Sequence, residues 1–240
     1  MIYVTADLHG CPLGVFQKLL DRAGFSEGDF LYILGDVIDR GPEGAQLLAF
    51  LSQQPNMELI LGNHEAMLLA CGFLFSEVTE ESLSSLTREN LALLQNWLQN
   101  GGAPTLTGLR RLLKEDPELL EGILDYLRES PLYEWVEAGG RRFLLVHGGL
   151  GNFQPDRPLE DYKPEELLWI RPEPGTRYFP DATVILGHTP TEFYGTPDRA
   201  FHGDGWINID TSPKPMLLRL EDLRETYMNS ESPEPGRADS

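Results

Sequence analysis

The chain has 240 residues and a formal net charge of −19, which is enough length for one large α/β domain or for a core with a modest insertion. The acidic balance argues against nucleic acid and membrane surfaces as partners, because both require clustered Lys and Arg. No apolar run approaches the roughly 20 residues of a membrane-spanning helix, and two cysteines do not make a disulfide framework, so we expect a cytoplasmic protein.

The first third of the chain alternates strand-like and helix-like segments. Ile2–Ala6, Phe30–Leu34 and Met57–Leu61 are apolar runs of strand length. Between them, Pro12–Ala23 and Pro42–Ser52 carry apolar residues at helical spacing. This order is typical of βαβ units, and it predicts an α/β fold with at least partly parallel strands.

The composition changes between about residues 66 and 135. Glu80–Asn100 and Pro117–Ser130 are rich in Leu and Glu with helical periodicity, and Gly101–Pro104 separates them. We interpret the segment as a helical insertion. It has two equally supported roles: a cover over or beside a functional site, and a plain structural outer layer.

Strand-like runs return in the last third, at Phe143–Val146, Ala182–Leu186, Trp206–Ile209 and Met216–Leu220. Residues 228–240 are polar and contain Pro, Gly and Ser, so we expect a disordered tail there. The predicted organisation is a single domain over residues 1–227 that contains the helical insertion at about 66–135.

Short polar islands follow five of the strand-like runs. They are Asp7–His9, Gly35–Gly41, Gly62–Glu65, His147–Gly149 and Gly187–His188, and they contain four of the chain's five histidines. Ligands in open α/β sheets gather at the carboxyl ends of strands. We therefore expect the islands to form one site.

The residue types in the islands suit a pair of divalent cations. Asp7 and His9 are two residues apart and can face one space, while the carboxylate of Asp36 can bridge two ions. Two ions about 3.5–4 Å apart clamp the attacking and leaving oxygens of a phosphoryl displacement and lower the pKa of a bound water to near 7. Asp and His suit Mn²⁺, Fe or Zn²⁺. The expected ligands are Asp7, His9, Asp36, Asn63, His147 and His188.

A charge count favours an anionic substrate at this site. Two divalent ions add four positive charges, while Asp7, Asp36 and a bridging hydroxide remove three, and Arg40 adds one. The site is then locally cationic inside an acidic protein. A phosphate group gains more from that field than a neutral ester or peptide does.

The five islands, taken in order, resemble the phosphoprotein phosphatase family, in its bacterial and phage branch, within the calcineurin-like metallophosphoesterases. The resemblance covers roughly residues 1–220 and is weakest over the helical insertion. It implies an α/β fold in which a β-sandwich is flanked by helices, in α/β/β/α layers. It also implies that Asp7, His9 and Asp36 hold one metal, and that Asp36 and the remaining three ligands hold the other.

The resemblance further implies which residues act on the substrate. His64, paired with Asp39, would protonate the leaving oxygen, while Arg40, Asn63 and Arg171 would bind the phosphate. The pairing also has a physical rationale, because a buried carboxylate fixes the tautomer of a histidine and raises its pKa. Asp39 could equally cap the helix that begins near Pro42.

These features predict a dinuclear metal-dependent phosphatase. The expected reaction is hydrolysis of Ser/Thr or Tyr phosphomonoesters in a phosphorylated protein or peptide, by in-line attack of a metal-bridging hydroxide. Mn²⁺ is the favoured metal, with Fe or Zn²⁺ as alternatives, and a monomer is compatible with the sequence. Neither nucleic acid nor a membrane is an expected partner.

Two other functions are considered. The alternative enzyme is a symmetrical diadenosine tetraphosphate hydrolase, which the same family core supports and which would need a surface for adenine stacking. A metal-binding scaffold without catalysis is the third reading, and it is disfavoured because every expected ligand is present. The aromatic residues considered for adenine stacking are Trp97, Tyr126, Tyr133 and Trp135.

Overall fold

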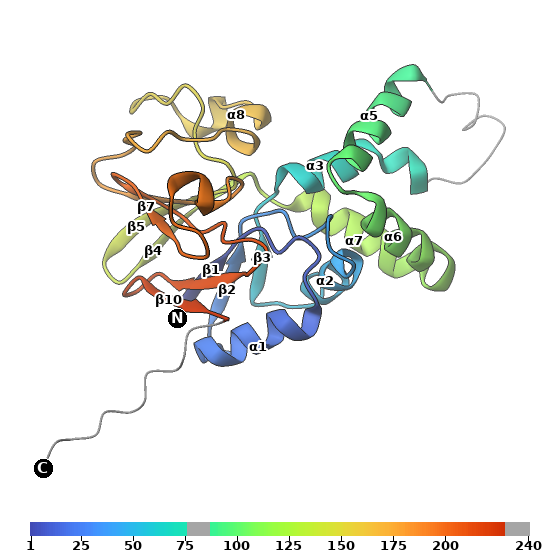
Figure 1. Ribbon diagram of the computed structural model, residues 1–240, viewed down its shortest axis with the longest axis horizontal. Helices are drawn as coiled ribbons and strands as arrows, with labels where there is room; N and C mark the ends of the chain where they lie inside the picture. Colours follow the sequence, from blue (N-terminus) through green and yellow to red (C-terminus); the bar gives the residue numbers. More distant parts are fainter. Residues whose placement is uncertain (76–86, 229–240) are drawn as a thin grey trace, which may run out of the picture.

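The computed structural model describes residues 1–75 and 87–228. The expected tail at 228–240 lies outside this range apart from Met228, as does the start of the helix expected from Glu80. The remaining segments form two five-stranded sheets with helices around them (Figure 1). The prediction of a β-sandwich flanked by helices is confirmed.

The first sheet is built mainly from the two ends of the chain. β1, β2 and β3 are parallel, and β9 and β10 continue the sheet antiparallel on the side of β1. The strand order is β10 (Arg224–Tyr227), β9 (Met216–Arg219), β1 (Ile2–Thr5), β2 (Phe30–Ile33) and β3 (Met57–Leu59).

The second sheet has a parallel centre with an antiparallel strand at each edge. β5, β6 and β8 are parallel, so their carboxyl ends point the same way. The strand order is β4 (Tyr133–Ala138), β5 (Arg141–Val146), β6 (Thr183–Leu186), β8 (Trp206–Asn208) and β7 (Phe201–His202).

Helices cover the outer faces and one end of the molecule. α5, α6 and α7 gather at one end, and α8 lies apart from them, on the side of the second sheet (Figure 1). Three short 3₁₀ helices occupy Gly72–Phe75, Leu159–Asp161 and Thr191–Tyr194. The α-helices are α1 (Leu13–Ala23), α2 (Gly44–Leu51), α3 (Asn63–Ala70), α5 (Arg88–Gln99), α6 (Ala103–Glu115), α7 (Pro117–Glu129) and α8 (Pro164–Leu168).

Alternation along the strands divides the core into layers. In β5, Phe143 and Leu145 face the core between the two sheets, whereas Leu144 and Val146 pack into the cluster outside the second sheet. In the first sheet, Val4 faces the inter-sheet core and Tyr3 packs with the helices. Successive side chains of a strand point to opposite faces. Because both faces of these strands are buried, the strands appear in the sequence as continuous apolar runs.

The helices of the expected insertion pack onto the frame. α6 packs against α2, α5 packs against α3, and α7 contacts both α2 and α3. The fully buried Trp97 of α5 and Ile123 of α7 join the same apolar cluster as Leu47 of α2. α6 lies between the two helices that the sequence predicted, and it was not predicted.

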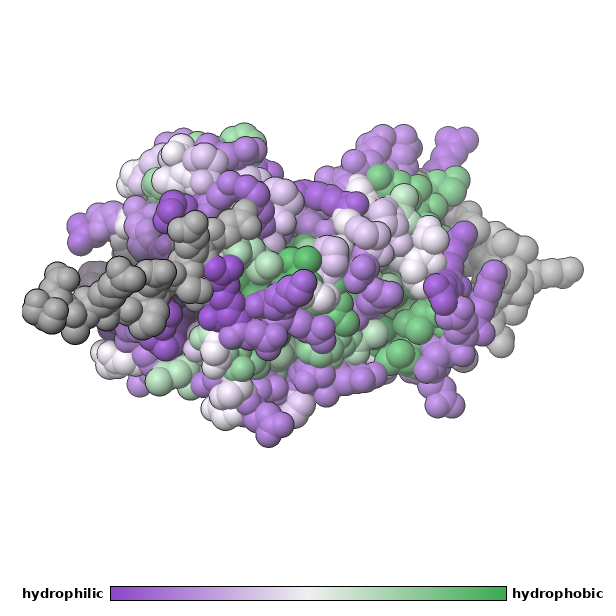
Figure 2. All heavy atoms as spheres, turned by 60° about the horizontal axis from the view of Figure 1, so that its bottom comes forward, coloured by the Kyte–Doolittle hydropathy of each residue, from purple (hydrophilic) through white to green (hydrophobic). Residues whose placement is uncertain are grey.

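Hydrophilic side chains prevail on the face of the molecule shown in Figure 2, and hydrophobic ones lie between them at its centre and toward its right side. Among the described residues, no helix combines the length and apolar character needed to cross a bilayer.

Candidate metal centre and active site

The predicted islands converge where parallel strands of both sheets end. Asp7, Asp36 and Asn63 follow β1, β2 and β3, while His147 and His188 follow β5 and β6. The two sheets thus bring their carboxyl edges to one place, as parallel strands in α/β folds do around ligand sites. All five side chains are buried.

Backbone hydrogen bonds join the first two islands to each other. The N–H of Asp7 donates to the carbonyl of Gly35 at 3.1 Å, and the N–H of His9 donates to that of Asp36 at 2.8 Å. Gly10 continues the series by donating to Val37 at 2.7 Å. These bonds extend the β1–β2 pairing past the strand ends, so Asp7, His9 and Asp36 are held at fixed mutual positions.

Left-handed backbone conformation is concentrated at the site. Non-glycine residues rarely adopt positive φ, and where they do the strain commonly marks a functional position. Of the nine such residues in the described ranges, six are predicted site residues. They are Asp7 (φ 53°), His9 (43°), Asp36 (53°), Asp39 (70°), Arg40 (64°) and His188 (66°).

Two glycines allow the islands to approach each other closely. A Cβ on Gly35, whose φ is 73°, would lie 2.3 Å from the Cα of Gly62. A Cβ on Gly187 would lie 2.1 Å from Oδ2 of Asp7. Any side chain at either position would push the islands apart.

One group of potential ligands consists of His9, Asp36 and His64, whose ligand atoms lie within 4.8 Å of one another. The Nε2 atoms of His9 and His64 are 3.8 and 3.7 Å from Oδ2 of Asp36. Asp7 borders this group, with Oδ1 3.9 Å from Nε2 of His9, and its oxygens accept the backbone N–H of His188 at 3.0 and 3.2 Å. The expected ligand Asp7 therefore lies at the edge of this group, which His64 completes.

The second group consists of Asp36, His147 and His188, again within 4.8 Å. Oδ1 of Asp36 is 3.4 Å from Nε2 of His147. Oδ1 of Asn63 lies 2.8 Å from that same Nε2 and 2.9 Å from Nδ1 of His188. The two oxygens of Asp36 thus serve different groups, which is the arrangement expected of a bridging carboxylate.

The protonation states of the histidines fit bound cations. Nδ1 of His9 lies 3.1 Å from the carbonyl of Ile38, and Nδ1 of His147 lies 2.6 Å from that of Leu34. A carbonyl only accepts, so each Nδ1 carries the proton and each Nε2 presents a lone pair toward Asp36. Lone pairs that face carboxylate oxygens repel unless a cation lies between them. The donor set therefore fits divalent metal ions.

Burial and neighbouring charges keep the ligands in the forms that metals require. Burial lowers the pKa of His9 to about 4, and burial followed by the effect of His147 lowers that of His188 to about 3. Burial opposes ionisation of Asp36, but His147, His64 and His9 together hold the pKa of its carboxyl below the ordinary value. His9 and His188 are consequently neutral at physiological pH, as metal ligands must be.

Uncompensated negative charge remains beside the first group. Burial, then Asp210 and Asp36, raise the pKa of Asp7 well above its ordinary value. Burial also raises the pKa of Asp210 to about 6. Asp210 follows β8 and is buried, and it was not predicted as a site residue. A cation at this position would relieve the crowding of Asp7, Asp36 and Asp210.

The predicted pair of His64 and Asp39 is formed. Nδ1 of His64 lies 2.6 Å from Oδ2 of Asp39, and both side chains are buried. Burial lowers the pKa of His64, but Asp36 and the hydrogen bond to Asp39 outweigh it and raise the pKa above its ordinary value. Asp39 makes no side-chain cap for α2, whose N-cap residue is Glu43.

The helices of the insertion hold Asp39 and Arg40. Nε1 of Trp97 donates to the same Oδ2 of Asp39 at 2.8 Å. The backbone N–H of Asp39 donates to Oγ1 of Thr105 at 2.9 Å, and that of Arg40 donates to the carbonyl of Gly101 at 3.0 Å. The insertion therefore supports the site directly. Sequence reasoning missed all three contacts.

Glu65 is a second functional residue that sequence reasoning did not assign. Its carboxylate accepts the backbone N–H groups of Asp36 at 2.8 Å, Val37 at 2.9 Å and Gly62 at 3.1 Å. Burial, then the charge of Asp36, raise the pKa of Glu65 to about 7. The contacts tie the second and third islands together. Its position three residues after Gly62, as in a capping box, is the signal that could have identified it.

The two predicted arginines lie at the exposed side of the site. Arg40 is exposed, and its charge opposes the rise in the pKa of Asp7. Arg171 is also exposed. After burial and the charge of His147, its charge contributes to the low pKa of His188, which the charge of Asp36 opposes. Arg40 is thus near Asp7 and His9, and Arg171 is near His188. Both cations are thus available to an anionic substrate.

Two of the four aromatic residues named for adenine stacking, Trp97 and Trp135, are engaged in other contacts. Trp97 is fully buried and donates a hydrogen bond to Asp39, so its ring offers no surface for stacking. The ring of Trp135 is covered by Arg142, 3.8 Å above its centroid, and packs against Phe179. Instead, Trp169 is 42% exposed and its ring centroid lies 5.9 Å from that of His188.

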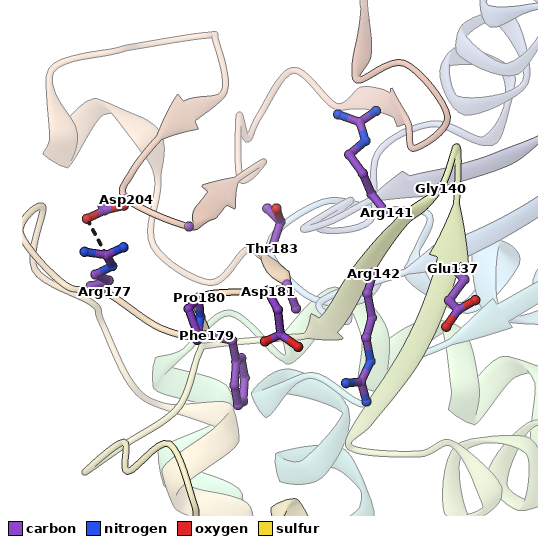
Figure 3. Close-up of a pocket in the computed structure, with 12 residues that line it drawn as sticks. Glu137, Gly140, Arg141, Arg142, Arg177, Phe179, Pro180, Asp181, Thr183 and Asp204 are labelled. Carbon is purple, nitrogen blue, oxygen red and sulfur yellow. Dashed lines mark ion pairs between the residues drawn. The ribbon is translucent and has the colours of Figure 1, made fainter.

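A separate cavity of about 510 Å³ lies at the opposite, amino-terminal ends of β5 and β6. Figure 3 shows Arg141, Arg142 and Arg177 around it, with Arg177 paired to Asp204. Arg141 donates to two backbone carbonyls, and Arg142 covers the ring of Trp135. The arginines are occupied by the protein itself, and no predicted site residue lines this cavity.

Comparison with known proteins agrees with the geometry. A family model for calcineurin-like phosphoesterases matches residues 1–207. A symmetrical bis(5'-nucleosyl)-tetraphosphatase of Paracidovorax citrulli is 29% identical over 162 residues, which is 66% of this chain and 48% of that protein. One of Pseudomonas fluorescens is 34% identical over 150 residues, which is 62% of this chain and 42% of that protein. The matches thus span less than half of these relatives.

A solved structure supports the fold. The crystal structure of a candidate diadenosine tetraphosphatase superposes with a TM-score of 0.62 at 17% identity, covering 94% of this chain and 91% of that one. At this identity the similarity shows the fold alone.

The comparisons correct two predictions. The curated relatives are named for hydrolysis of a dinucleotide tetraphosphate, so the expected phosphoprotein phosphatase activity and the expected protein or peptide substrate are wrong. The physical reason is that the islands encode phosphoryl chemistry, whereas the leaving group is selected by surfaces outside them. With the match over residues 1–207, the chain belongs to the calcineurin-like phosphoesterase family.

Proposed function

We propose that this protein hydrolyses a symmetrical bis(5'-nucleosyl) tetraphosphate at the centre of its phosphate chain and releases two nucleoside diphosphates. The observation that carries the proposal is the pair of ligand groups sharing Asp36, flanked by the exposed Arg40 and Arg171. Such a site suits a phosphate chain with several negative charges. The names of the curated relatives support the same substrate class.

Six residues would hold two divalent metal ions. Asp7, His9 and Asp36 would hold one ion, and Asp36 together with Asn63, His147 and His188 would hold the other. When bound, such ions polarise the phosphoryl group and acidify a water molecule. This ligand set suits Mn²⁺, Fe and Zn²⁺ alike.

His64 would supply the proton to the leaving group. In the reaction, the oxygen of water joins one of the two central phosphorus atoms and the bridging oxygen departs with the other. Asp39 fixes Nδ1 of His64 as a donor, which leaves Nε2 facing the ligand groups. The raised pKa of His64 keeps a proton available near neutral pH.

Arginines and an exposed ring would position the substrate. Arg40 and Arg171 bear positive charge at the exposed side of the site, where they can bind phosphate oxygens on either side of the scissile bond. Trp169 is exposed beside His188. Base stacking on an aromatic ring contributes about 1–3 kcal/mol. The ring of Trp169 would therefore stack on a base of the substrate and favour a nucleotide over inorganic phosphate.

The products test the proposal. Diadenosine tetraphosphate is incubated with the protein and Mn²⁺ in water enriched in ¹⁸O, and products are separated by anion-exchange chromatography. We expect ADP alone, with one ¹⁸O introduced per pair of ADP molecules. Formation of AMP and ATP, or no hydrolysis at all, would contradict the proposal.

Trp169→Ala tests the contribution of the exposed ring. We expect KM for the dinucleotide to rise about tenfold, with kcat changed little, because the ring binds the base and not the reacting phosphate. The matched control is Leu91→Ala, because Leu91 is also an exposed apolar residue but lies on α5. This variant should leave both constants unchanged.

A further inference from the structure

A second cavity opens directly from the site and has no role in the function described above. It has a volume of about 430 Å³, and both His9 and Arg40 line it. His9 belongs to the first ligand group, and Arg40 is the exposed cation beside it. A ligand whose phosphate reaches the metal site can therefore extend its other end into this cavity.

The walls of the cavity are apolar and rigid. Four of its lining residues are prolines, and they come from four separate segments of the chain: Pro12, Pro42, Pro190 and Pro213. Proline rings have little conformational freedom, so binding against them costs little side-chain entropy. Binding sites for small molecules are commonly apolar cavities of about 300–1,000 Å³ with a few polar groups, and this cavity falls in that range.

The cavity has a cationic and an anionic residue at different places in its lining. Arg40 provides a cation at the site, whereas Glu192 contributes an exposed carboxylate elsewhere in the lining. A second phosphate beside Glu192 would be repelled, while a neutral group with hydrogen-bond donors would be favoured. A nucleoside has an apolar face, an amino edge and ribose hydroxyls that meet these requirements, and it carries its phosphates at one end.

We propose that this cavity binds the nucleoside of one half of the substrate, with Glu192 accepting a hydrogen bond from the base or ribose. The proposal rests on the proposed function, because it assigns a binding site to one part of the same substrate. The nucleoside would lie in the cavity between Pro12 and Glu192. A neighbouring groove of about 540 Å³ between α2 and α6 shares Pro42 but contains no site residue.

Binding of ADP and methyl diphosphate, measured by isothermal titration calorimetry with Mn²⁺, tests the assignment. The two ligands share the diphosphate, and only ADP has a nucleoside. We expect ADP to bind about tenfold more tightly, equivalent to 1.4 kcal/mol. Equal affinity of the wild-type protein for both ligands would overturn the proposal.

Two variants locate the preference. Glu192→Ala removes the proposed acceptor, and Pro12→Asn replaces one apolar wall with a residue that suits the N-cap position of α1. We expect each to weaken ADP binding about three- to tenfold and to leave methyl diphosphate unchanged. Weakening of both ligands alike, or of neither, would contradict the assignment.

Glu115→Ala is the matched control, since Glu115 is an exposed acid that lines the groove between α2 and α6. It should leave the preference for ADP intact, and a loss there would place the nucleoside in that groove instead. The two proposals fail separately. If ADP binding responds as expected but the dinucleotide is not cleaved at its centre, the proposed function is wrong and the nucleoside site stands.

Discussion

The strand-end loops and the helices α5–α7 support one site by different means. The loops carry the potential metal ligands, and they are fixed by backbone hydrogen bonds such as that from His9 to Asp36. The helices carry no ligand among their described residues. Instead, Trp97 and Thr105 bind the side chain and backbone of Asp39.

The difference separates two kinds of contribution. The proposed ligand residues would hold the metal ions beside the reacting groups. Trp97 and Thr105 instead hold Asp39, which pairs with His64. Removal of a ligand should therefore abolish activity, and removal of a supporting contact should reduce it in steps. Mutation of residues that support metal ligands typically lowers metal affinity or activity 10–100-fold. The following experiments test this ranking, from the largest expected effect to the smallest.

Asp36→Asn should have the largest effect. Asp36 is the shared member of both ligand groups, so loss of one charged oxygen weakens both metal positions. We expect kcat/KM for the dinucleotide to fall by at least about 10³-fold. Metal content by mass spectrometry should fall together with activity. Full activity of the wild-type protein after exhaustive chelation would contradict a metal-dependent mechanism.

His64→Asn should reduce activity by about 10²–10⁴-fold, since it removes the proposed general acid. The loss should be larger for substrates with poor leaving groups, such as an alkyl phosphate, than for an activated aryl phosphate. Steady-state kinetics on both substrates measures the difference. Equal losses would show that His64 acts as a ligand or a structural residue, which its membership in the first ligand group makes a real alternative.

Acid titration of the metal-free protein tests the burial of the ligands. The folded pKa of His9 is lowered to about 4, so between pH 6.5 and 4 the unfolded state takes up a proton that the folded state does not. The contribution of His9 to the free energy of unfolding therefore decreases as the pH is lowered through that window, by about 2 kcal/mol from pH 7 to pH 5. His9→Asn should remove this contribution, as measured by urea unfolding at both pH values.

Glu65→Gln is the matched variant, because Glu65 should change stability with pH in the direction opposite to His9. The folded pKa of Glu65 is raised to about 7, so the folded state binds a proton that the unfolded state binds only near pH 4.5. Its contribution to stability therefore falls as pH rises through 7. The glutamine variant should gain relative to the wild type as pH rises from 5 to 7. Identical pH slopes for both variants would refute this account.

Trp97→Phe should have the smallest effect of the series, about tenfold in kcat. The substitution keeps most of the apolar packing and removes the N–H that donates to Asp39. In ¹⁵N-tryptophan-labelled protein, the indole signal of Trp97 should shift in the variant Asp39→Asn. Trp135→Phe, at a ring packed against Arg142 and Phe179, is the matched control and should retain activity. Unchanged kcat in Trp97→Phe would reduce the insertion to a structural cover.

The sequence alone predicted the parallel strands of the frame and which residues lie together at their carboxyl ends. β1, β2 and β3 lie at the predicted apolar runs within two residues, and Asp7, Asp36 and Asn63 follow them as expected. This succeeded because strand burial and the polarity of the residues after a strand are local properties of the chain. The carboxyl edge of a parallel sheet then brings such residues together without further information.

Only the tertiary structure decided what supports the ligands and what surrounds the substrate. Trp97 and Thr105 lie 58 and 66 residues from Asp39 in the sequence, and neither has a local pattern that distinguishes it from a core residue. Trp97 was considered for adenine stacking, yet the fold buries it and exposes Trp169 instead. Burial and long-range hydrogen bonding depend on how helices pack against the frame. The residue pattern of the islands therefore determined the phosphoryl chemistry, and the packing around them decided which surfaces remain for the rest of the substrate.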